Sequence, residues 1–286
     1  MDLDDLLHLE PHGADTFVGT GPRYPWGGLY GGQIVGQALR AATHTVETGL
    51  RPHSLRAYFI RAGDHTEPVR YEVDRLRNGR SYTTRRVVAR QAVGAILNLE
   101  ASYTGGDASD DRQKLAMPEV PGPRELVTDT WTELADRRYV PLEAGLGQVH
   151  LWLRWARPIG EDPVANETAF AFLSDDAPSD AIKSLLMEPD VTSDEFDERW
   201  FMVSLDHTIW FHRPVLADRW HLHHFTCDRF VDGRGLSIGQ VFSEDGMHVA
   251  TIAQEMLLRH RRPTTAGPPP AGPRTSGPTT AGATRG

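Results

Sequence analysis

Hydrophobic residues recur at helical spacing near the start of each half of the chain. In "GGQIVGQALRAATHTV", residues 31–46, apolar side chains return every three or four positions, as on one face of an amphipathic helix. A second helical pattern covers residues 173–186, where Ser174 precedes two aspartates and a proline, a composition typical of a helix N-terminus. After each pattern come stretches of alternating apolar and polar residues, which predict antiparallel strands.

The order of these elements is the same in both halves: one helix and then about four strands at hairpin spacing. The repeat predicts an α+β fold of two tandem hotdog units, each a long helix wrapped by a curved antiparallel sheet. We assign residues 1–110 to the N-terminal hotdog, 111–144 to an interdomain linker and 145–262 to the C-terminal hotdog. Residues 263–286 are dominated by Pro, Gly and Thr, and we expect them to be disordered.

Charge and composition exclude several classes of function. The net charge of −9 argues against nucleic acid as a partner, because phosphate contacts need a basic surface. We expect no stable membrane insertion, since no apolar run approaches the roughly 20 residues that span a bilayer. The single cysteine, Cys227, excludes an intrachain disulfide and a cysteine-based zinc site. With an acidic N-terminus that lacks the pattern of a secretory signal, these features predict a cytoplasmic protein.

One short motif matches a different class of enzyme. The segment "GLSIG", residues 235–239, has the G-x-S-x-G pattern of the nucleophile elbow in serine hydrolases. An elbow requires a strand, a sharp turn and then a helix. Here the sequence after Ser237 continues as a strand, a hairpin turn at Asp245-Gly246 and another strand. We therefore interpret Ser237 as an ordinary strand residue.

The histidines of "WHLHHF", residues 220–225, raise the question of a metal. His221 and His223 would share one face of a strand, but no third ligand is evident and the chain has no HExxH motif. We expect no metal site and no cofactor.

Gln254 is a polar residue at a position where an apolar one is expected. On a strand it shares a face with Ile252 and Met256. If this face is buried, the amide must find partners, because an unsatisfied buried polar group costs about 1–3 kcal/mol. A structural hydrogen bond would explain Gln254 as well as a catalytic role.

A second strand, "VSLDHTIWF", mixes polar and large apolar groups on both of its faces. Regular alternation places four of its residues on one face: Ser204, Asp206, Thr208 and Trp210. A purely structural strand more often separates the two kinds of side chain, so this strand is a candidate for lining a site.

Asp175 and Asp176 follow Ser174 at the predicted helix N-terminus, where capping and the helix dipole alone explain acidic residues. A carboxylate close to Ser204 and Gln254 would have another use. It would accept a proton from a water molecule whose orientation the hydroxyl and the amide fix. The residues alone leave both interpretations open.

Four motifs together resemble the acyl-CoA thioesterase II (TesB-like) family, which has a double hotdog fold. They are "GGQIVGQA", "HSLRAYF", "SLDHTIWFHRP" and "ATIAQE", and the resemblance extends over residues 20–260. It implies hydrolysis of fatty acyl-CoA to a free fatty acid and coenzyme A, by an activated water and without a covalent intermediate. By resemblance, the catalytic residues are Asp175 in "FLSD", Ser204 and Gln254. It also implies a homo-oligomer.

Substrate-binding candidates are less specific. Gly31 and Gly32 would let the first helix begin close to the ligand, although close helix packing explains them equally well. Trp210 is included for its position in the candidate strand. Candidates for the coenzyme A phosphates are Arg85, Arg86 and Arg213.

Two other functions fit the same fold. A double hotdog protein that binds acyl-CoA without hydrolysing it is the main alternative, and the presence of all three residue types favours the enzyme. A hotdog dehydratase uses a histidine near the central helix, and residues 173–186 contain none.

Overall fold

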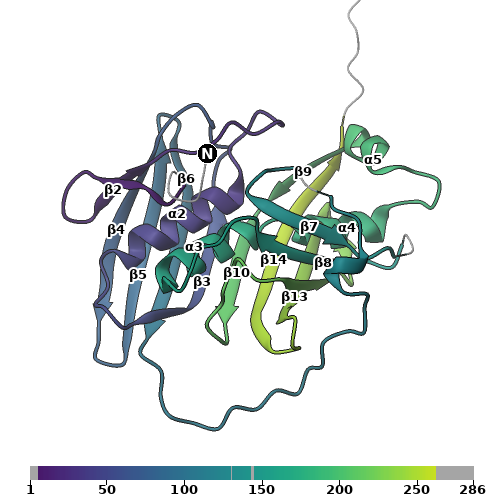
Figure 1. The fold of residues 1–286 in the computed structure, drawn as a ribbon. Helices are drawn as coiled ribbons and strands as arrows, with labels where there is room; N and C mark the ends of the chain where they lie inside the picture. Colours follow the sequence, from purple (N-terminus) through teal and green to yellow (C-terminus); the bar gives the residue numbers. More distant parts are fainter. Residues whose placement is uncertain (1–5, 130, 143–144, 262–286) are drawn as a thin grey trace, which may run out of the picture.

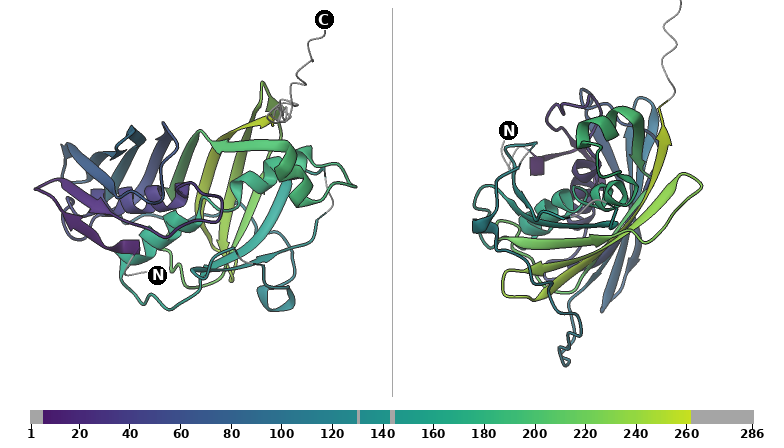
Figure 2. Two further views of the ribbon diagram at one scale, coloured as in Figure 1. Left: turned by 90° about the horizontal axis from the view of Figure 1, so that it is seen from above. Right: turned by 90° about the vertical axis from the view of Figure 1, so that its right-hand side faces the viewer.

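The computed structural model describes residues 6–129, 131–142 and 145–261, so the predicted disordered tail at 263–286 lies outside the described residues. The described strands form one curved antiparallel sheet, with helices on its concave side (Figures 1 and 2). The purple and blue half of Figure 1 is the N-terminal half of the chain, and the green and yellow half is the C-terminal half.

The N-terminal half is built around one helix. Its elements are β1 (Leu9–Pro11), β2 (Thr16–Gly19), α2 (Gly31–Thr43), β3 (Arg51–Phe59), β4 (Val69–Asn78), β5 (Tyr82–Gln91) and β6 (Gly94–Thr104). The strands lie in the order β2-β4-β5-β6-β3, so the strand that follows the helix is at the inner end of this half.

The C-terminal half repeats that topology. Its elements are β7 (Ala135–Tyr139), β8 (Gln148–Trp155), α3 (Pro163–Leu173), α4 (Pro178–Leu186), α5 (Ser193–Arg199), β9 (Trp200–Ser204), β10 (Asp206–Phe211), β11 (His221–Thr226), β12 (Phe230–Val231), β13 (Arg234–Ser243) and β14 (His248–His260). The order β8-β11-β13-β14-β10 matches that of the N-terminal half strand for strand. The prediction of two tandem hotdog units is confirmed.

The two halves join through their inner strands and their helices. β3 and β10 pair antiparallel, with Ala57 opposite His207, so the sheet is continuous across the molecule. On the concave side α2 packs against α3 at very short range. A Cβ atom on Gly32 would lie 2.2 Å from the carbonyl oxygen of Phe172, so only glycine allows this approach. Close helix packing, one of the two explanations offered for the glycine at position 32, therefore accounts for Gly32.

The segment between the halves does more than connect them. Residues 111–144, assigned to the linker, contain a short 3-10 helix (Pro123–Glu125) and the edge strand β7, which pairs with β8. The segment also covers the outer face of the C-terminal sheet. Its apolar side chains Met117, Val120 and Leu126 pack on a cluster of Val140, Trp152, Trp220, Leu222 and Phe242.

The predicted helix at 173–186 is wrong in its start and its continuity. Helix α3 begins ten residues earlier, where Asp162 caps it by accepting a hydrogen bond from the backbone of Val164, 3.0 Å away. Ser174 is the C-terminal cap of α3, not the start of a helix, and α4 follows after a turn. Residues 165–173 are all buried, so this helix has no polar side to reveal its period.

Candidate active site

Asp175 lies in the turn between α3 and α4, and its carboxylate is enclosed where this turn meets the start of α2. The Gln254 side chain and the backbone N–H of Gly32 are the donors that face it, and both stabilise its ionised form. The pKa of Asp175 is raised to about 7, mainly by burial and in smaller part by the neighbouring Asp176, while Gln254 and Gly32 oppose the shift. Among the described residues, the Oδ1 atom of Asp175 has no hydrogen-bond partner.

Gln254 is on β14, is 1% exposed and points to the concave side. Its Nε2 atom donates to the Ser204 Oγ atom over 2.8 Å, and its Oε1 atom contacts the Nδ1 atom of His207. With Asp175, three groups therefore converge on one amide. The structure brings together the three residues that the sequence singled out for catalysis.

Ser204 reaches this group because of a β-bulge. Along β14, Met256 pairs with Ser204 and Ala253 pairs with Thr208. Four positions separate Ser204 from Thr208, but three separate their partners, so one strand carries an extra residue. An extra residue reverses the alternation of side chains beyond it. The prediction that Ser204 shares a face with Thr208 is therefore wrong.

Asp206 holds the bulge in place. Its Oδ1 atom accepts the backbone N–H of Glu255 over 2.8 Å, the position a ladder carbonyl would take in a regular strand. The backbone N–H of Leu205 bonds the Glu255 carbonyl over 2.9 Å. The carboxylate of Asp206 also pairs with exposed Arg56 at 3.0 Å. Asp206 thus has a structural task outside the Asp175 group.

Trp210 lies on the outer face of the sheet and is 43% exposed. It is three positions beyond His207, which faces inward, so the two side chains point to opposite sides. The structure does not bring Trp210 to the three converging residues.

The N-terminus of α2 supplies the opposite wall. A Cβ atom on Gly31 would lie 2.6 Å from the Oδ2 atom of Asp175, so the helix begins directly against this carboxylate. The backbone N–H of Gly32 faces the same carboxylate and lowers its pKa. The first N–H groups of a helix have no partner within the helix and carry partial positive charge. The two glycines therefore place a helix end from one half beside a carboxylate of the other.

His207 is a buried member of the group that the sequence reasoning missed. It is 0% exposed, and its Nε2 atom lies 2.8 Å from the Ser174 Oγ atom. Burial lowers the pKa of His207 to about 4, so the ring is neutral near pH 7. The sequence signal was its place in "SLDHTIWF", on the face opposite Asp206.

Ser237 lies in the middle of β13, directly opposite Gln254, and is fully buried. The strand continues on both sides of it, so the strand-turn-helix geometry of a nucleophile elbow is absent here.

The three arginines proposed for phosphate contacts all have partners within the chain. Arg85 is 2% exposed and donates to backbone and side-chain oxygens, among them the carbonyl of Thr45 at 2.8 Å. Arg86 pairs with Asp74 and Arg213 with Asp111. Arg85 stabilises the end of α2 and its following loop, which removes it as a surface anchor for phosphate.

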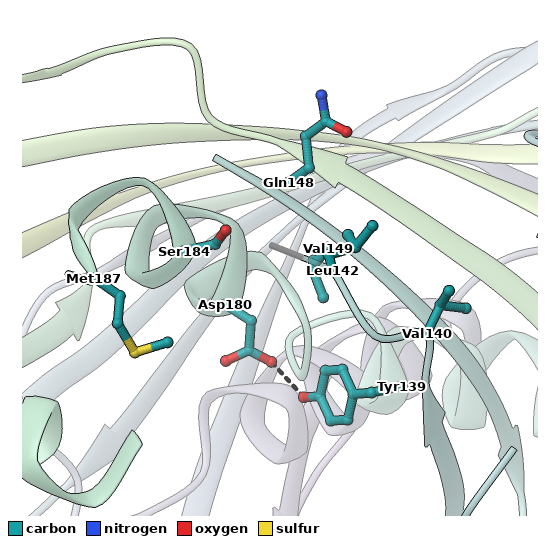
Figure 3. Close-up of a pocket in the computed structure, with 8 residues that line it drawn as sticks. All are labelled: Tyr139, Val140, Leu142, Gln148, Val149, Asp180, Ser184 and Met187. Carbon is teal, nitrogen blue, oxygen red and sulfur yellow. Dashed lines mark hydrogen bonds between the residues drawn. The ribbon is translucent and has the colours of Figure 1, made fainter. Parts of the chain in front are cut away.

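A second buried polar cluster adjoins the first. Asp176 pairs with Arg137 at 2.8 Å and accepts a hydrogen bond from the Trp131 ring over 3.0 Å. The Tyr139 hydroxyl donates to Asp180 on α4, at the wall of a pocket of about 210 Å³ (Figure 3). The remaining lining residues are Val140, Leu142, Gln148, Val149, Ser184 and Met187.

Within the described ranges, no group of three or more His, Cys, Asp or Glu side chains is arranged to hold a metal ion. None of the described helices is long and apolar enough to cross a membrane.

Two family models together match almost all of the described chain. One is described as the acyl-CoA thioesterase N-terminal domain and matches residues 20–104; the other, the acyl-CoA thioesterase C-terminal domain, matches residues 106–258. The chain belongs to the acyl-CoA thioesterase family. It is accordingly a thioester hydrolase, and the resemblance found in its motifs is confirmed.

Individual relatives agree with this assignment. The human protein acyl-coenzyme A thioesterase 8 is 35% identical over 89% of this chain and 88% of its own length. Acyl-CoA thioesterase 2 of Haemophilus influenzae is 30% identical over 90% and 96%. The crystal structure of acyl-CoA thioesterase II TesB2 from Mycobacterium marinum superposes with a TM-score of 0.79 at 33% identity, covering 94% of this chain and 100% of that one.

Proposed function

We propose that this chain hydrolyses fatty acyl-CoA to a free fatty acid and coenzyme A, with a water molecule activated by Asp175, Ser204 and Gln254. The observation that carries the proposal is the convergence of these three side chains, from a turn, β9 and β14, on one buried point beside the N-terminus of α2. The relatives named as acyl-CoA thioesterases support acyl-CoA as the substrate.

In this mechanism Asp175 is the general base. A carboxyl with a pKa near 7 removes a proton better than an ordinary carboxylate and is still ionised in a useful fraction at neutral pH. Its unpartnered Oδ1 atom is the acceptor for the water proton. Ser204 already accepts a hydrogen bond from Gln254, so its own O–H is free to donate to the water oxygen and orient it.

The chemical steps then follow in order. Water attacks the thioester carbonyl carbon while Asp175 takes its proton, and the carbonyl oxygen becomes negative. The N-terminus of α2, at Gly31, supplies partial positive charge where that oxygen develops. The C–S bond breaks, coenzyme A leaves as a thiolate, and protonated Asp175 returns the proton. A thiol with a pKa of about 8.5 is a good leaving group and needs little acid assistance.

The same contacts support hydrolysis without an acyl-enzyme. A serine nucleophile needs a base within hydrogen-bond reach. Both ring nitrogens of His207 are engaged, by Gln254 and by Ser174, so this histidine does not reach Ser204 as a base. Ser237 is buried without a hydrogen-bond partner for its hydroxyl among the described residues.

The decisive experiment follows free-thiol release from acyl-CoA substrates of short to long chain length. We expect Asp175→Asn to lower kcat by about 10²–10⁴-fold, the range for loss of a general base, and Ser204→Ala and Gln254→Ala to lower it strongly. Ser237→Ala, the matched serine control, retains activity. Loss of activity in a folded Ser237→Ala variant would revive the nucleophile elbow. Acyl-CoA binding by wild type with no thiol release at any length would make the chain a binding protein.

We also propose that the chain forms a homo-oligomer. Exposed apolar side chains lie on the outer face of three central strands, where a second copy would cover them: Tyr58 on β3, Trp210 on β10 and Leu236 on β13. Light scattering coupled to gel filtration measures the mass directly. A monomer at micromolar concentration contradicts this proposal and leaves the catalytic one untouched.

A further inference from the structure

We propose that His207 is a positioning residue, which fixes the orientation of the Gln254 amide so that its N–H groups face Asp175 and Ser204. This inference rests on the function proposed above, because it assigns the residue that orients one member of the catalytic group.

Among the described residues, the hydrogen-bond partners of the His207 ring are Gln254 and Ser174. It is on β10, next to Gln254 on β14, and its ring is enclosed on the concave side of the sheet. One ring nitrogen contacts the Gln254 Oε1 atom, and the other lies 2.8 Å from the Ser174 hydroxyl. Asp206, its neighbour in sequence, is the charged group that acts on the ring, and its carboxylate is turned to the Glu255 backbone.

The chemistry of the amide makes this contact directional. An ionised carboxylate can only accept hydrogen bonds, so Asp175 needs the N–H side of the Gln254 amide. The amide oxygen is then turned toward His207, whose Nδ1 atom must carry a hydrogen. A neutral imidazole has one N–H, so its Nε2 atom has to accept the hydrogen of the Ser174 hydroxyl.

A reversed arrangement is also available to these groups. The Ser174 Oγ atom lies 2.8 Å from the carbonyl oxygen of Ala171 as well, and it has a single hydrogen to give. With that hydrogen on Ala171, His207 would carry its hydrogen on Nε2 and the amide would turn its oxygen to Asp175. That contact is acceptable only to a protonated carboxyl. The catalytically competent, ionised Asp175 therefore goes with the Nδ1–H form of His207.

Substitutions test the direction of the hydrogen bond. His207→Asn places an N–H donor near the position of Nδ1, whereas His207→Leu fills the space without a donor. An amide that no longer faces the ionised Asp175 loses an interaction with a charged group, so we expect kcat to fall about 10–100-fold in His207→Leu, with KM changed by less than about 3-fold. His207→Asn recovers most of the loss, and His207→Gln, whose donor reaches toward Ser174 instead, does not.

The pH dependence of kcat distinguishes a positioning role from a packing defect, because a packing defect leaves the pKa of Asp175 unchanged. A hydrogen bond from Gln254 lowers the pKa of Asp175, so loosening the amide in His207→Leu moves the acid limb of the kcat profile to higher pH. The matched control is His223→Leu. His223 is also buried, on the concave side of β11 beside Phe170, and among the described residues its Nδ1 atom has no hydrogen-bond partner. We expect its profile to keep the wild-type limb.

A measurement on the unaltered full chain covers the case in which a variant does not fold. Long-range proton–nitrogen NMR correlations distinguish the protonated from the unprotonated ring nitrogen of each histidine. At pH 8, with Asp175 ionised, we expect the His207 signal, assigned by sequential correlations in the unaltered chain, to show hydrogen on Nδ1. Hydrogen on Nε2 at that pH overturns the proposal.

The outcomes separate this inference from the proposed function. If Asp175→Asn and Gln254→Ala lose activity while a folded His207→Leu keeps kcat within twofold of wild type, only the positioning role is wrong. An equal loss of kcat in His207→Leu, His207→Asn and His207→Gln, with the acid limb at its wild-type position, also contradicts the positioning role, because a packing effect gives that pattern. If Asp175→Asn hydrolyses acyl-CoA at the wild-type rate, the proposed function fails first.

Discussion

At the scale of single residues, the site depends on a carboxyl group kept in an unfavourable environment. Asp175 is enclosed by both halves of the chain, and the nearby donors Gln254 and Gly32 compensate only part of the cost of ionising it there. Ionisable groups whose pKa is strongly shifted by burial concentrate at functional sites. The pattern of residues placed Asp175 at a helix start and left capping as an explanation; only the observed turn after α3 removes that alternative.

The raised pKa predicts the pH dependence of hydrolysis. Only the ionised form of Asp175 can accept the water proton, so kcat/KM should rise about tenfold per pH unit up to about pH 7 and level off above it. Asp176 and the buried Tyr30 interact with this carboxyl. Asp176→Asn removes a negative charge and should move the limb to lower pH. A wild-type limb that ends below pH 5 contradicts the buried general base.

The ionisation of Asp175, which activity requires, also lowers the stability of the folded chain. The folded-state pKa of Asp175, about 7, is above the unfolded value of about 3.9, so its contribution to stability is fully present below about pH 4 and is lost as pH rises through 7. Asp175→Asn cannot ionise. We expect Asp175→Asn to be more stable than wild type at pH 8 by up to about 4 kcal/mol, the free energy of about three pKa units, and to melt roughly 10 °C higher, with a smaller difference at pH 5.

Thermal melts at the two pH values, with exposed Asp107→Asn as the control, measure this difference. A variant that is less stable than wild type at pH 8 shows that the hydrogen bonds of Asp175 outweigh its burial.

At the scale of elements, the β-bulge at Leu205 decides which face Ser204 occupies. Strand alternation, read from the sequence, groups Ser204 with Asp206 and Trp210, yet the structure puts Ser204 inside and Trp210 outside. A bulge depends on how two strands pair across the sheet, and local alternation contains no record of it. The family resemblance selected Ser204 through its motif, whereas the alternation that suggested Trp210 does not continue past the bulge.

The start of helix α3 is a second feature that the sequence pattern did not predict. The helix repeat of the N-terminal half is visible in the sequence because α2 alternates apolar residues with polar ones, and Arg40 and Thr43, three positions apart, are partly exposed. Most of α3 is enclosed, and its apolar run has no helical period. Its Asp162-Pro163 start is a local signal that was available and was not used.

Asp206 provides a test of the bulge. Asp206→Ala removes the acceptor of the Glu255 N–H and leaves that group unsatisfied, so we expect a loss of about 1–3 kcal/mol in the free energy of unfolding. Ser204 should shift with the released backbone, and kcat should fall with it. Asp206→Asn keeps an oxygen at this position and should retain most of both properties. Arg56→Ala, which removes only the exposed partner of Asp206, is the control.

Chemical denaturation and thiol release measure the two effects of Asp206→Ala. Loss of stability with unchanged kcat shows that the position of Ser204 does not depend on the bulge contact.

At the scale of the whole molecule, the site exists because two hotdog units lie side by side within one chain and share one sheet. The C-terminal half supplies Asp175, Ser204, Gln254 and His207, and the N-terminal half supplies the start of α2. The repeat of elements was enough to predict this architecture, because each unit follows the same order of helix and strands. The distance from Gly31 to Asp175 was not predictable, since it results from the packing of α2 on α3 across the two halves.

Gly31 therefore gives the test of whether both halves are needed for catalysis. A methyl group at this position would lie 2.6 Å from the Asp175 Oδ2 atom and 3.1 Å from the ring of Phe59, so the carboxylate has to move. Displacement of a catalytic group by about 1 Å can cost about 10²-fold, and we expect a fall of that order in kcat for Gly31→Ala. Its fold should persist, because the methyl group meets side chains and not backbone.

Gly28→Ala, three positions upstream, is the matched control. An added methyl there meets only the Trp26 ring, at an ordinary contact distance of 3.7 Å, so kcat should stay within twofold of wild type. Gly32→Ala makes the opposite comparison: its methyl would meet the backbone carbonyl of Phe172, and we expect lost stability as well as lost activity. If folded Gly31→Ala hydrolyses acyl-CoA like wild type, the start of α2 does not form a wall of the site, and catalysis belongs to the C-terminal half alone.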